Sequence, residues 1–341
     1  MKNYKYTLAV VIPCWNEEKL LPEMLECLLK QTFCDWRAFC VDDTSTDSTA
    51  EVIKGYQEKD NRINYFCRNR EPKSGQTCRN IGLELSTDAK YIVFFDADDL
   101  VAPYCFEQRV NFMEAHPNID LGVFPMLAIT NSITEESGPV FGVKTFDDDL
   151  EAMLAFHVPL QTATNIYRRD SLISNHIEYD LNIKSYQDVD FNIQLLIRGL
   201  KYDYDTNAKA DFFYRVDYNG VAGQINTKQH FDSHLYFLDK VTQDVSGIYG
   251  KKYDFYLEAM IVNFLGLFKK YWSPYFKLLQ LPWIKKRKSF VCRIILYLMI
   301  FKLDRRIIFM KYRRYSKLQN SIWRKAMAVK LNNLLDRGVE V

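Results

Sequence analysis

The sequence has 341 residues, 48% of them hydrophobic and 15% aromatic, which excludes a disordered or low-complexity chain and allows one large domain or two smaller ones. The formal net charge of +2 hides two parts of opposite charge. Residues 1–268 carry 26 Lys and Arg against 40 Asp and Glu, whereas residues 269–341 carry 19 against 3. A segment as basic as the second part needs an acidic partner.

The spacing of the cysteines and the lengths of the apolar runs further limit the class of protein and its location in the cell. The eight cysteines show no C-x-x-C spacing, so they predict reduced core thiols in a cytosolic protein and not a zinc site. The run Leu8–Pro13 is too short for a signal peptide. The charge-free run Ile294–Phe301 is far short of the roughly 20 residues that span a bilayer. We therefore expect a cytoplasmic protein without a spanning helix.

Apolar runs and helical periodicity predict four strands and three helices in the first hundred residues. The expected strands are Leu8–Pro13, Arg37–Val41, Ile63–Cys67 and Tyr91–Phe95. The expected helices are Glu17–Lys30, a helix that Ser45 or Asp47 caps and that runs through Tyr56, and Gln76–Leu85. Strands that alternate with helices in this way are typical of a doubly wound α/β sheet.

The middle of the chain continues with mixed elements. We expect helices from Pro103 to Ala115, at Asp147–Phe156 and at Gln187–Gly199, strands at Leu121–Thr130 and Thr164–Arg168, and an extended segment Tyr202–Tyr214. From about Tyr236 the pattern changes to long helices with many aromatic residues.

Residues 283–315 interleave short apolar faces with Lys and Arg, which is typical of a helix lying on an anionic membrane. Nucleic-acid binding is disfavoured because it does not need the apolar run Ile294–Phe301. The open alternative is that this basic segment packs against the acidic part of the chain. The segment is also a candidate contact in a homo-oligomer.

Polar residues follow the first, second and fourth predicted strands, where ligands bind in doubly wound sheets. Three carboxylates, Asp96, Asp98 and Asp99, stand within four positions directly after an apolar strand. Like charges beside a core are tolerated when a cation or a ligand's donors compensate them, although a solvated loop that caps the next helix is the simpler alternative. No G-x-G-x-x-G or G-x-x-x-x-G-K-[ST] segment is present, so neither a Rossmann dinucleotide site nor a P-loop is predicted.

Five segments in order resemble the family 2 glycosyltransferases, nucleotide-sugar-dependent enzymes with the GT-A fold. They are Val11–Glu17, Val41–Thr49, Arg79–Leu83, Asp96–Asp99 and Gln187–Phe191. The resemblance covers about residues 6–215. It implies a GT-A domain over residues 1–235, with a nucleotide-sugar half to about residue 100 and an acceptor half over 101–235. A basic helical region, residues 236–341, follows.

The same resemblance implies a donor site for a nucleotide-sugar, with a UDP-sugar expected. The residues expected to hold the nucleotide are Pro13, Trp15, Glu17, Asp43, Arg79, Asp96 and Ala97. Asp43 would accept a hydrogen bond from uracil, because a carboxylate only accepts. Either Asp98 or Asp99 would bind Mn²⁺ or Mg²⁺ directly, since hard cations prefer oxygen ligands. Two alternatives stay open: Trp15 packs in the core, and Arg79 pairs with the acids around Asp96.

Asp188 matches the acid that the family uses as general base in an inverting transfer. Gln187 departs from the family, which usually has Glu at this position. The alternative is that Asp188 and Asp190 only cap a helix. His230 and His234 are expected to lie at the surface or in an acceptor site, and His157 in a loop or acceptor pocket.

The sequence thus predicts an enzyme that moves a sugar from a UDP-sugar to a hydroxyl of a cell-surface or capsular glycan, either free or lipid-linked. The basic segment would hold it on the inner face of the cell membrane. Two other classes remain open. One is a nucleotidyltransferase, which would need a basic, glycine-rich loop where Glu17 and Glu18 stand. The other is a degenerate, non-catalytic sugar-nucleotide-binding protein.

Overall fold

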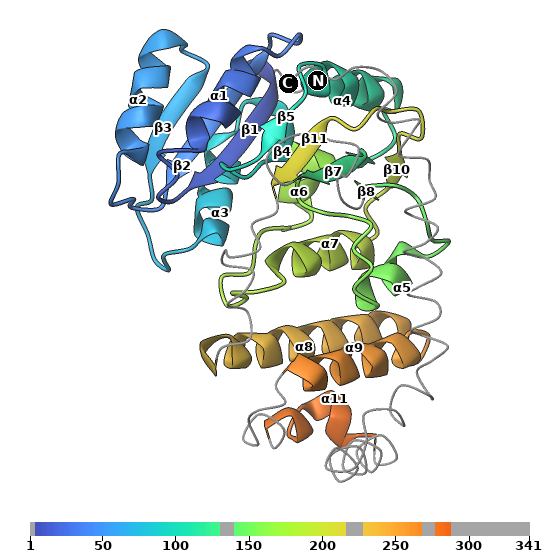
Figure 1. Cartoon of the computed structure of the whole chain (residues 1–341). Coiled ribbons are helices and arrows are strands. Elements are labelled where there is room, and N and C mark those ends of the chain that lie inside the picture. Colours follow the sequence, from blue (N-terminus) through green and yellow to red (C-terminus); the bar gives the residue numbers. More distant parts are fainter. Residues whose placement is uncertain (1–3, 130–139, 216–227, 268–276, 288–341) are drawn as a thin grey trace.

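The computed structural model describes residues 4–129, 140–215, 228–267 and 277–287, which form an α/β body followed by helices (Figure 1). The strands are β1 (Tyr6–Cys14), β2 (Trp36–Asp42), β3 (Ile63–Cys67), β4 (Ala89–Phe94), β5 (Leu100–Val101), β6 (Leu121–Val123), β7 (Met126–Ile129), β8 (Val140–Phe141), β9 (Asn165–Arg168), β10 (Tyr202–Tyr204) and β11 (Phe212–Arg215). The helices are α1 (Leu21–Leu29), α2 (Thr49–Lys59), α3 (Gly75–Leu85), α4 (Cys105–Ala115), α5 (Asp149–Leu154), α6 (Arg169–Ser174), α7 (Gln187–Ile197), α8 (Lys228–Tyr249), α9 (Asp254–Leu267) and α11 (Pro282–Lys285).

The larger sheet has seven strands in the order β10-β6-β9-β4-β1-β2-β3. β1 pairs in parallel with β2 and β4, and β2 pairs in parallel with β3, so these four strands end at the same edge. β9 runs antiparallel to β4 and β6, which makes the sheet mixed. The predicted doubly wound mixed sheet is confirmed, and it brings the loops after β1, β2 and β4 together.

Both faces of the sheet are covered, because successive residues of a strand point to opposite sides. Leu8, Val10 and Ile12 belong to a cluster with side chains of α1 and α4. Ala9 and Val11 belong to a second cluster with side chains of α7, α8 and α9. The continuous apolar run of β1 therefore reflects burial on both faces, as its sequence predicts.

Gly82 allows α3 to lie close against β1. A Cβ atom at this position would lie 2.2 Å from Cγ1 of Val11, a separation that no real side chain occupies. The glycine therefore sets how closely the first half of α3, which carries Arg79, approaches the sheet.

Two predicted extended segments are each divided between different sheets. Leu121–Thr130 forms β6 in the large sheet and β7 in a small sheet of order β5-β11-β7-β8, and Thr130 lies outside the described residues. Pro125 separates the two strands, because proline cannot donate to a ladder. Tyr202–Tyr214 likewise divides into β10 and β11, which belong to different sheets.

The first helix begins four residues later than predicted. Glu17 and Glu18 do not start α1, because their backbone N–H groups donate to Thr49 Oγ1 at 2.8 Å and to Asp47 Oδ2 at 3.1 Å. The helix starts at Leu21, with Pro22 in its first turn, where a missing N–H costs nothing.

The C-terminal helices begin earlier than predicted and pack on the α/β body. Helix α8 starts at Lys228, so the expected boundary at residue 235 falls inside it, and α8 and α9 lie below α7 in Figure 1. Their side chains belong to the same hydrophobic cluster as those of β1 and β4. Most of the predicted interfacial pattern, residues 283–315, lies outside the described residues. Within the described ranges, no helix has both the length and the apolar character needed to cross a bilayer.

Candidate active site

The loops after β1 and β2 are held together by side chains that replace missing backbone partners. Asn16 has a left-handed backbone conformation, with φ of 56°, and its Oδ1 accepts from the Thr46 N–H at 2.9 Å. The Asn16 N–H in turn donates to Ser45 Oγ at 3.0 Å. These bonds hold the loop after β1 against the loop after β2 at this edge of the sheet.

Asp42 holds this turn and does not point to a ligand. Its Oδ1 accepts from both the N–H and the hydroxyl of Ser45, at 3.1 and 2.5 Å. Asp42 therefore has a turn role.

The predicted nucleotide residues at this edge divide into exposed and buried groups. Trp15 is 49% exposed, so it does not pack in the core, and Lys73 Nζ lies 5.0 Å from the centre of its ring. Asp43 is buried and accepts from Arg68 Nε at 2.5 Å. Burial raises the pKa of Asp43, although the Arg68 guanidinium lowers it. An exposed aromatic ring thus stands beside a buried carboxylate whose charge is already partly compensated. Pro13 lies within β1, opposite Val41.

The three acids after β4 differ in their surroundings. Asp96 pairs with the guanidinium of Arg79. Burial and the charge of Asp96 raise the pKa of the partly exposed Asp98. Asp99 is 1% exposed, and its Oδ1 accepts from the Arg215 N–H at 2.8 Å. Asp99 Oδ2 is buried and has no hydrogen-bond partner among the described residues. Ala97, between them, is also buried.

The donor set of this segment fits a hard divalent cation. Burial and the charges of Asp98 and Asp96 raise the pKa of Asp99 well above its ordinary value, so the cluster lacks positive charge. Among the described residues, no group of three or more His, Cys, Asp or Glu side chains could hold a metal ion by itself. A cation here therefore needs further oxygens from a ligand. The positive charge of Arg215, which lowers the pKa of both Asp98 and Asp99, is a second source of compensation.

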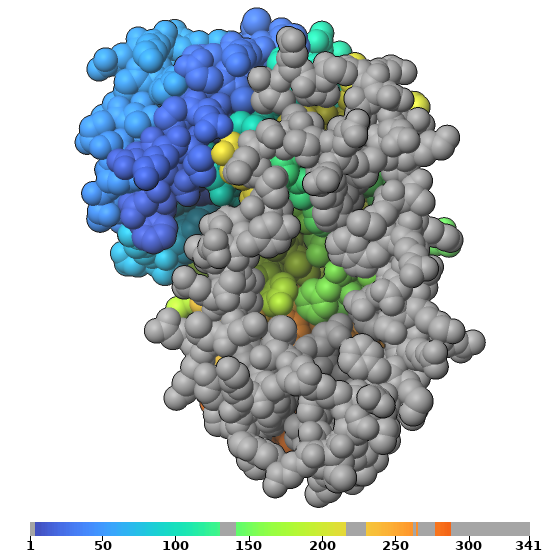
Figure 2. Space-filling view, in the orientation of Figure 1, coloured from blue at the N-terminus to red at the C-terminus, as the bar shows by residue number. Residues whose placement is uncertain are grey.

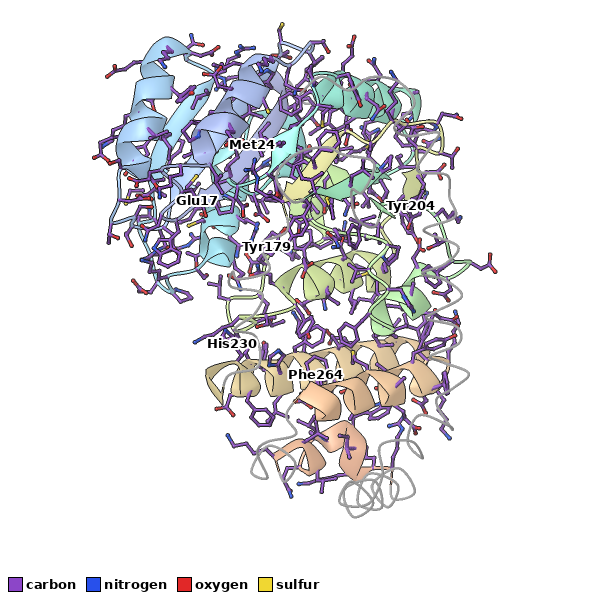
Figure 3. All side chains as sticks on the ribbon, in the orientation of Figure 1. Glu17, Met24, Tyr179, Tyr204, His230 and Phe264 are labelled. Carbon is purple, nitrogen blue, oxygen red and sulfur yellow. The ribbon has the colours of Figure 1, made fainter. Side chains whose placement is uncertain are left out.

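Glu17 belongs to the acidic centre as well as to the β1 loop (Figure 3). Burial raises its pKa to about 7, and the charges of Asp98, Asp47 and Asp96 add to the effect. Glu17 therefore lies within the electrostatic field of the acid segment.

Tyr179 connects α3 to α7, and Figure 3 shows it between these helices. The Arg79 guanidinium lies 5.3 Å from the centre of its ring, and the ring stacks on Phe191 of α7 at 4.3 Å. The side chain of Asn80 accepts from the Tyr179 N–H and donates to the Tyr179 carbonyl, both at 2.9 Å. The ring of Tyr179 thus packs against the Arg79 guanidinium. Arg79 Nε is buried and has no hydrogen-bond partner in the described part of the chain.

Asp188 lies in the first turn of α7, where the charges of Arg79 and Asp96 both act on it. Burial raises the pKa of Asp188, the positive charge of Arg79 lowers it, and the negative charge of Asp96 raises it. These two acids are 92 positions apart in the sequence, yet each lies in the electric field of the other. The residue before the helix, Tyr186, has a left-handed conformation with φ of 64° and packs its ring against Phe264 of α9.

Several residues that hold α7 were not predicted. Lys240 of α8 donates to Asp180 Oδ2 at 3.0 Å and to Asp190 Oδ2 at 2.7 Å. Asn192, one turn after the acid, donates to the Asp188 carbonyl at 2.8 Å and accepts from Asn165 of β9 at 3.0 Å. Asp190 therefore forms a buried ion pair and does not cap the helix. No local sequence pattern could have found the contacts of Lys240 and Asn165, because these join separate elements.

The histidines lie away from the surface positions that we expected. His234 is buried among aromatic rings, 5.3 Å from Tyr186 and 5.2 Å from Phe264, and burial lowers its pKa to about 4. It is therefore a neutral core residue, and the expectation of a surface position is wrong for it. An acceptor-site role stays a prediction. His157 is also buried, beside Phe146, and burial lowers its pKa.

Residues 9–175 match the family model described as glycosyl transferase family 2. Over these residues the chain belongs to this family, whose description names glycosyl transfer and not nucleotidyl transfer.

The relatives in sequence are mostly longer proteins. The chain is 27% identical over 271 residues to the minor teichoic acid biosynthesis protein GgaB of Bacillus subtilis, covering 77% of this chain and 29% of the relative. It is 26% identical over 220 residues to a poly(ribitol-phosphate) beta-glucosyltransferase of Bacillus spizizenii, covering 62% and 33%. The chain thus spans about a third of the length of these two proteins.

Solved structures confirm the GT-A fold. Residues 1–349 of Staphylococcus aureus TarS in complex with UDP superpose with a TM-score of 0.57 at 19% identity, covering 76% of this chain and 70% of that one. The mannosyltransferase PcManGT of Pyrobaculum calidifontis, in complex with GDP-Man and Mn²⁺, gives a TM-score of 0.52 at 14% identity, covering 98% and 89%.

Proposed function

We propose that this glycosyltransferase moves a sugar from a UDP-sugar to a hydroxyl of a cell-surface glycan with inversion, using Asp188 as general base. The observation that carries the proposal is that Arg79, which pairs with Asp96, also acts on the charge of Asp188 in the first turn of α7. A donor diphosphate held at the acids would place its sugar towards Asp188. Attack from the face opposite the leaving group then requires a proton acceptor on that side.

The donor nucleotide would lie along the edge formed by the loops after β1 and β2. Trp15 offers an exposed ring to a base, and Asp43 offers a carboxylate that accepts from an N–H group. Support for a uracil base comes from TarS, which has been solved with UDP and with UDP-GlcNAc. PcManGT, solved with GDP-Man, makes GDP-sugars the competing donor class.

A divalent cation would be held by Asp98 and Asp99, with Asp96 available to the ribose. When bound, Mn²⁺ or Mg²⁺ neutralises charge on the leaving diphosphate. Arg79 adds a fixed positive charge beside the same segment, because it is buried and paired with Asp96. The chain itself therefore binds and orients the diphosphate through residues of α3 and of the loop after β4.

Asp188 would take the proton of the acceptor hydroxyl. Its raised pKa makes it a stronger base than a solvated carboxylate, since burial disfavours the charged form. The positive charge of Arg79 limits this effect. Gln187, next to the base, contributes an amide in place of a second negative charge.

The acceptor would be a polymer of the cell envelope, such as a capsular glycan or a polyol-phosphate chain. The names of two relatives support this class, because they refer to teichoic acid and to poly(ribitol-phosphate).

We also propose that the basic segment, residues 269–341, holds the enzyme on an anionic membrane near a lipid-linked acceptor. Flotation of the full chain with anionic vesicles, compared with a chain ending at Arg287, tests that part; equal flotation would contradict it.

A donor screen tests the proposed reaction. Purified protein is incubated with Mn²⁺ and a panel of UDP- and GDP-sugars, and released nucleotide is measured. We expect slow release of UDP from one or a few UDP-sugars. Release of GDP alone would contradict the donor class, and no release from any sugar nucleotide would favour the degenerate binding protein.

A further inference from the structure

Strand β11 runs beside the acid segment. It pairs antiparallel with β5, so that Phe213 lies opposite Leu100, and its neighbour on the other side is β7. Continuing the β5 register by one residue places Tyr214 opposite Asp99. The bond from the Arg215 N–H to Asp99 Oδ1, at 2.8 Å, fixes this end of the strand.

The side chain of Tyr214 has the same orientation as that of Phe212, because alternate strand residues share a face. Phe212 is fully buried, and its ring lies 4.7 Å from that of Phe95, the residue directly before Asp96. Two positions further along, Tyr214 extends past Phe95 towards the acids. Unlike its neighbours in β11, it is 36% exposed.

The segment that ends in β11 also lies against the N-terminal part of the chain. In Figure 2, yellow atoms of residues shortly before 216 touch blue atoms of the N-terminal segment. The contact agrees with the ion pair between Arg215 and Glu23 of α1, at 2.9 Å. This pair and the Asp99 bond both fix Arg215, the residue after Tyr214, and β5 and β7 pair with β11 on its two sides.

The charges that act on Tyr214 come from both halves of the site. Burial raises the pKa of Tyr214 to about 12, and four carboxylates add to this: Asp99, Asp98, Asp96 and Asp188. The ring therefore lies within the field of the acid segment and of the predicted base together. It stays a neutral phenol under ordinary conditions.

We propose that the ring of Tyr214 is the platform on which the transferred sugar packs. This inference rests on the proposed function, in which the anomeric carbon lies between the diphosphate at the acids and the base Asp188. Tyr214 is an exposed aromatic side chain at that position, whereas Trp15 lies at the nucleotide end. An aromatic ring offers an apolar face to the C–H groups of a pyranose, and the phenol offers a polar tip to its hydroxyls.

The test compares binding of UDP with binding of UDP-glucose and UDP-N-acetylglucosamine. Calorimetry on the full chain with Mn²⁺ gives Kd for Tyr214→Ala, Tyr214→Phe and a control, Phe255→Ala, which removes an aromatic ring that is 51% exposed on α9. We expect Tyr214→Ala to weaken UDP-sugar binding about tenfold while the Kd for UDP stays within about twofold. Tyr214→Phe keeps the ring and should stay within about threefold. The control should match the unaltered chain.

Each of the other outcomes would contradict either the platform role of Tyr214 or the proposed function. Unchanged UDP-sugar binding by Tyr214→Ala overturns the platform, and so does an equal loss for UDP and UDP-sugar, which indicates a structural role. A rise only in the KM for the acceptor would place the ring at the acceptor and overturn the inference as stated. If the unaltered chain binds no UDP-sugar of the donor panel, the proposed function fails, and the platform fails with it.

Discussion

Lys240 Nζ lies 2.7 Å from Asp190 Oδ2, and this ion pair joins α8 to α7, the helix that carries Asp188. Asp190 is 1% exposed, so its charge is compensated inside the protein and not by water. The helices after residue 228 are therefore part of the support of the site.

Replacing Lys240 by Met should destabilise the protein by about 3 kcal/mol at neutral pH, because it leaves a buried carboxylate without its partner. Chemical denaturation measures the free energy of unfolding. Lys277→Met is the matched control, since Lys277 pairs with Asp232 at the surface and its loss should cost less than about 1 kcal/mol. Equal effects of the two substitutions would contradict a supporting role for Lys240.

The ionisation of Asp190 should make stability depend on pH. Burial raises its pKa to about 6 from an ordinary value of 3.8, although Lys240 lowers it. Between these values the folded chain holds a proton that the unfolded chain has released, so the contribution of Asp190 to stability falls as pH rises from about 4 to 6. The free energy of unfolding of Asp190→Asn, measured relative to the unaltered chain, should therefore increase by on the order of 2 kcal/mol over this window. A constant difference across the window would contradict the raised pKa.

Gly82→Ala should destabilise the protein by about 1–3 kcal/mol, because the new methyl group meets Val11. Gly55→Ala, in α2, has no atom within 4 Å and should stabilise it by about 0.5–1 kcal/mol. Thermal or chemical unfolding measures both changes. Val11→Ala in the Gly82→Ala background should recover part of the loss; if it adds a full further loss, α3 is not held at this distance by the glycine.

Removing the cation should weaken donor binding. We expect EDTA to raise the Kd for UDP about tenfold or more, and Mn²⁺ or Mg²⁺ to restore it. Asp99→Asn keeps an oxygen for the Arg215 N–H but loses the charge, so its UDP binding should no longer respond to EDTA. UDP binding that is insensitive to EDTA in the unaltered chain would show that Arg215, and not a metal ion, compensates the acids.

The sequence predicts those parts of the site that depend on short segments. Continuous apolar runs identify β1, β2 and β4, and the three acids follow β4 directly, so their shared edge could be inferred from the order of elements. The exposure of Trp15 could not, because an aromatic residue after a strand is equally common in a core.

Contacts between distant elements were the part that could not be predicted. The support of Arg79 by Tyr179, the pairing of Lys240 with Asp190 and the approach of Tyr214 to Asp99 join residues 50 to 115 positions apart. Their side chains show no spacing that differs from an ordinary amphipathic helix or strand. His234 illustrates the same limit, since its i, i+4 spacing from His230 arises on a buried helix face.

The role of Asp188 is the central claim, and transfer by Asp188→Asn tests it most directly. The variant keeps the shape of the side chain but cannot accept a proton. With the donor identified by the screen and a glycan acceptor, we expect kcat for transfer to fall on the order of 10³-fold while the Kd for UDP is unchanged. Glu178→Gln, which neutralises an exposed acid nearby, should leave both unchanged. Transfer by Asp188→Asn at the rate of the unaltered chain would contradict the account.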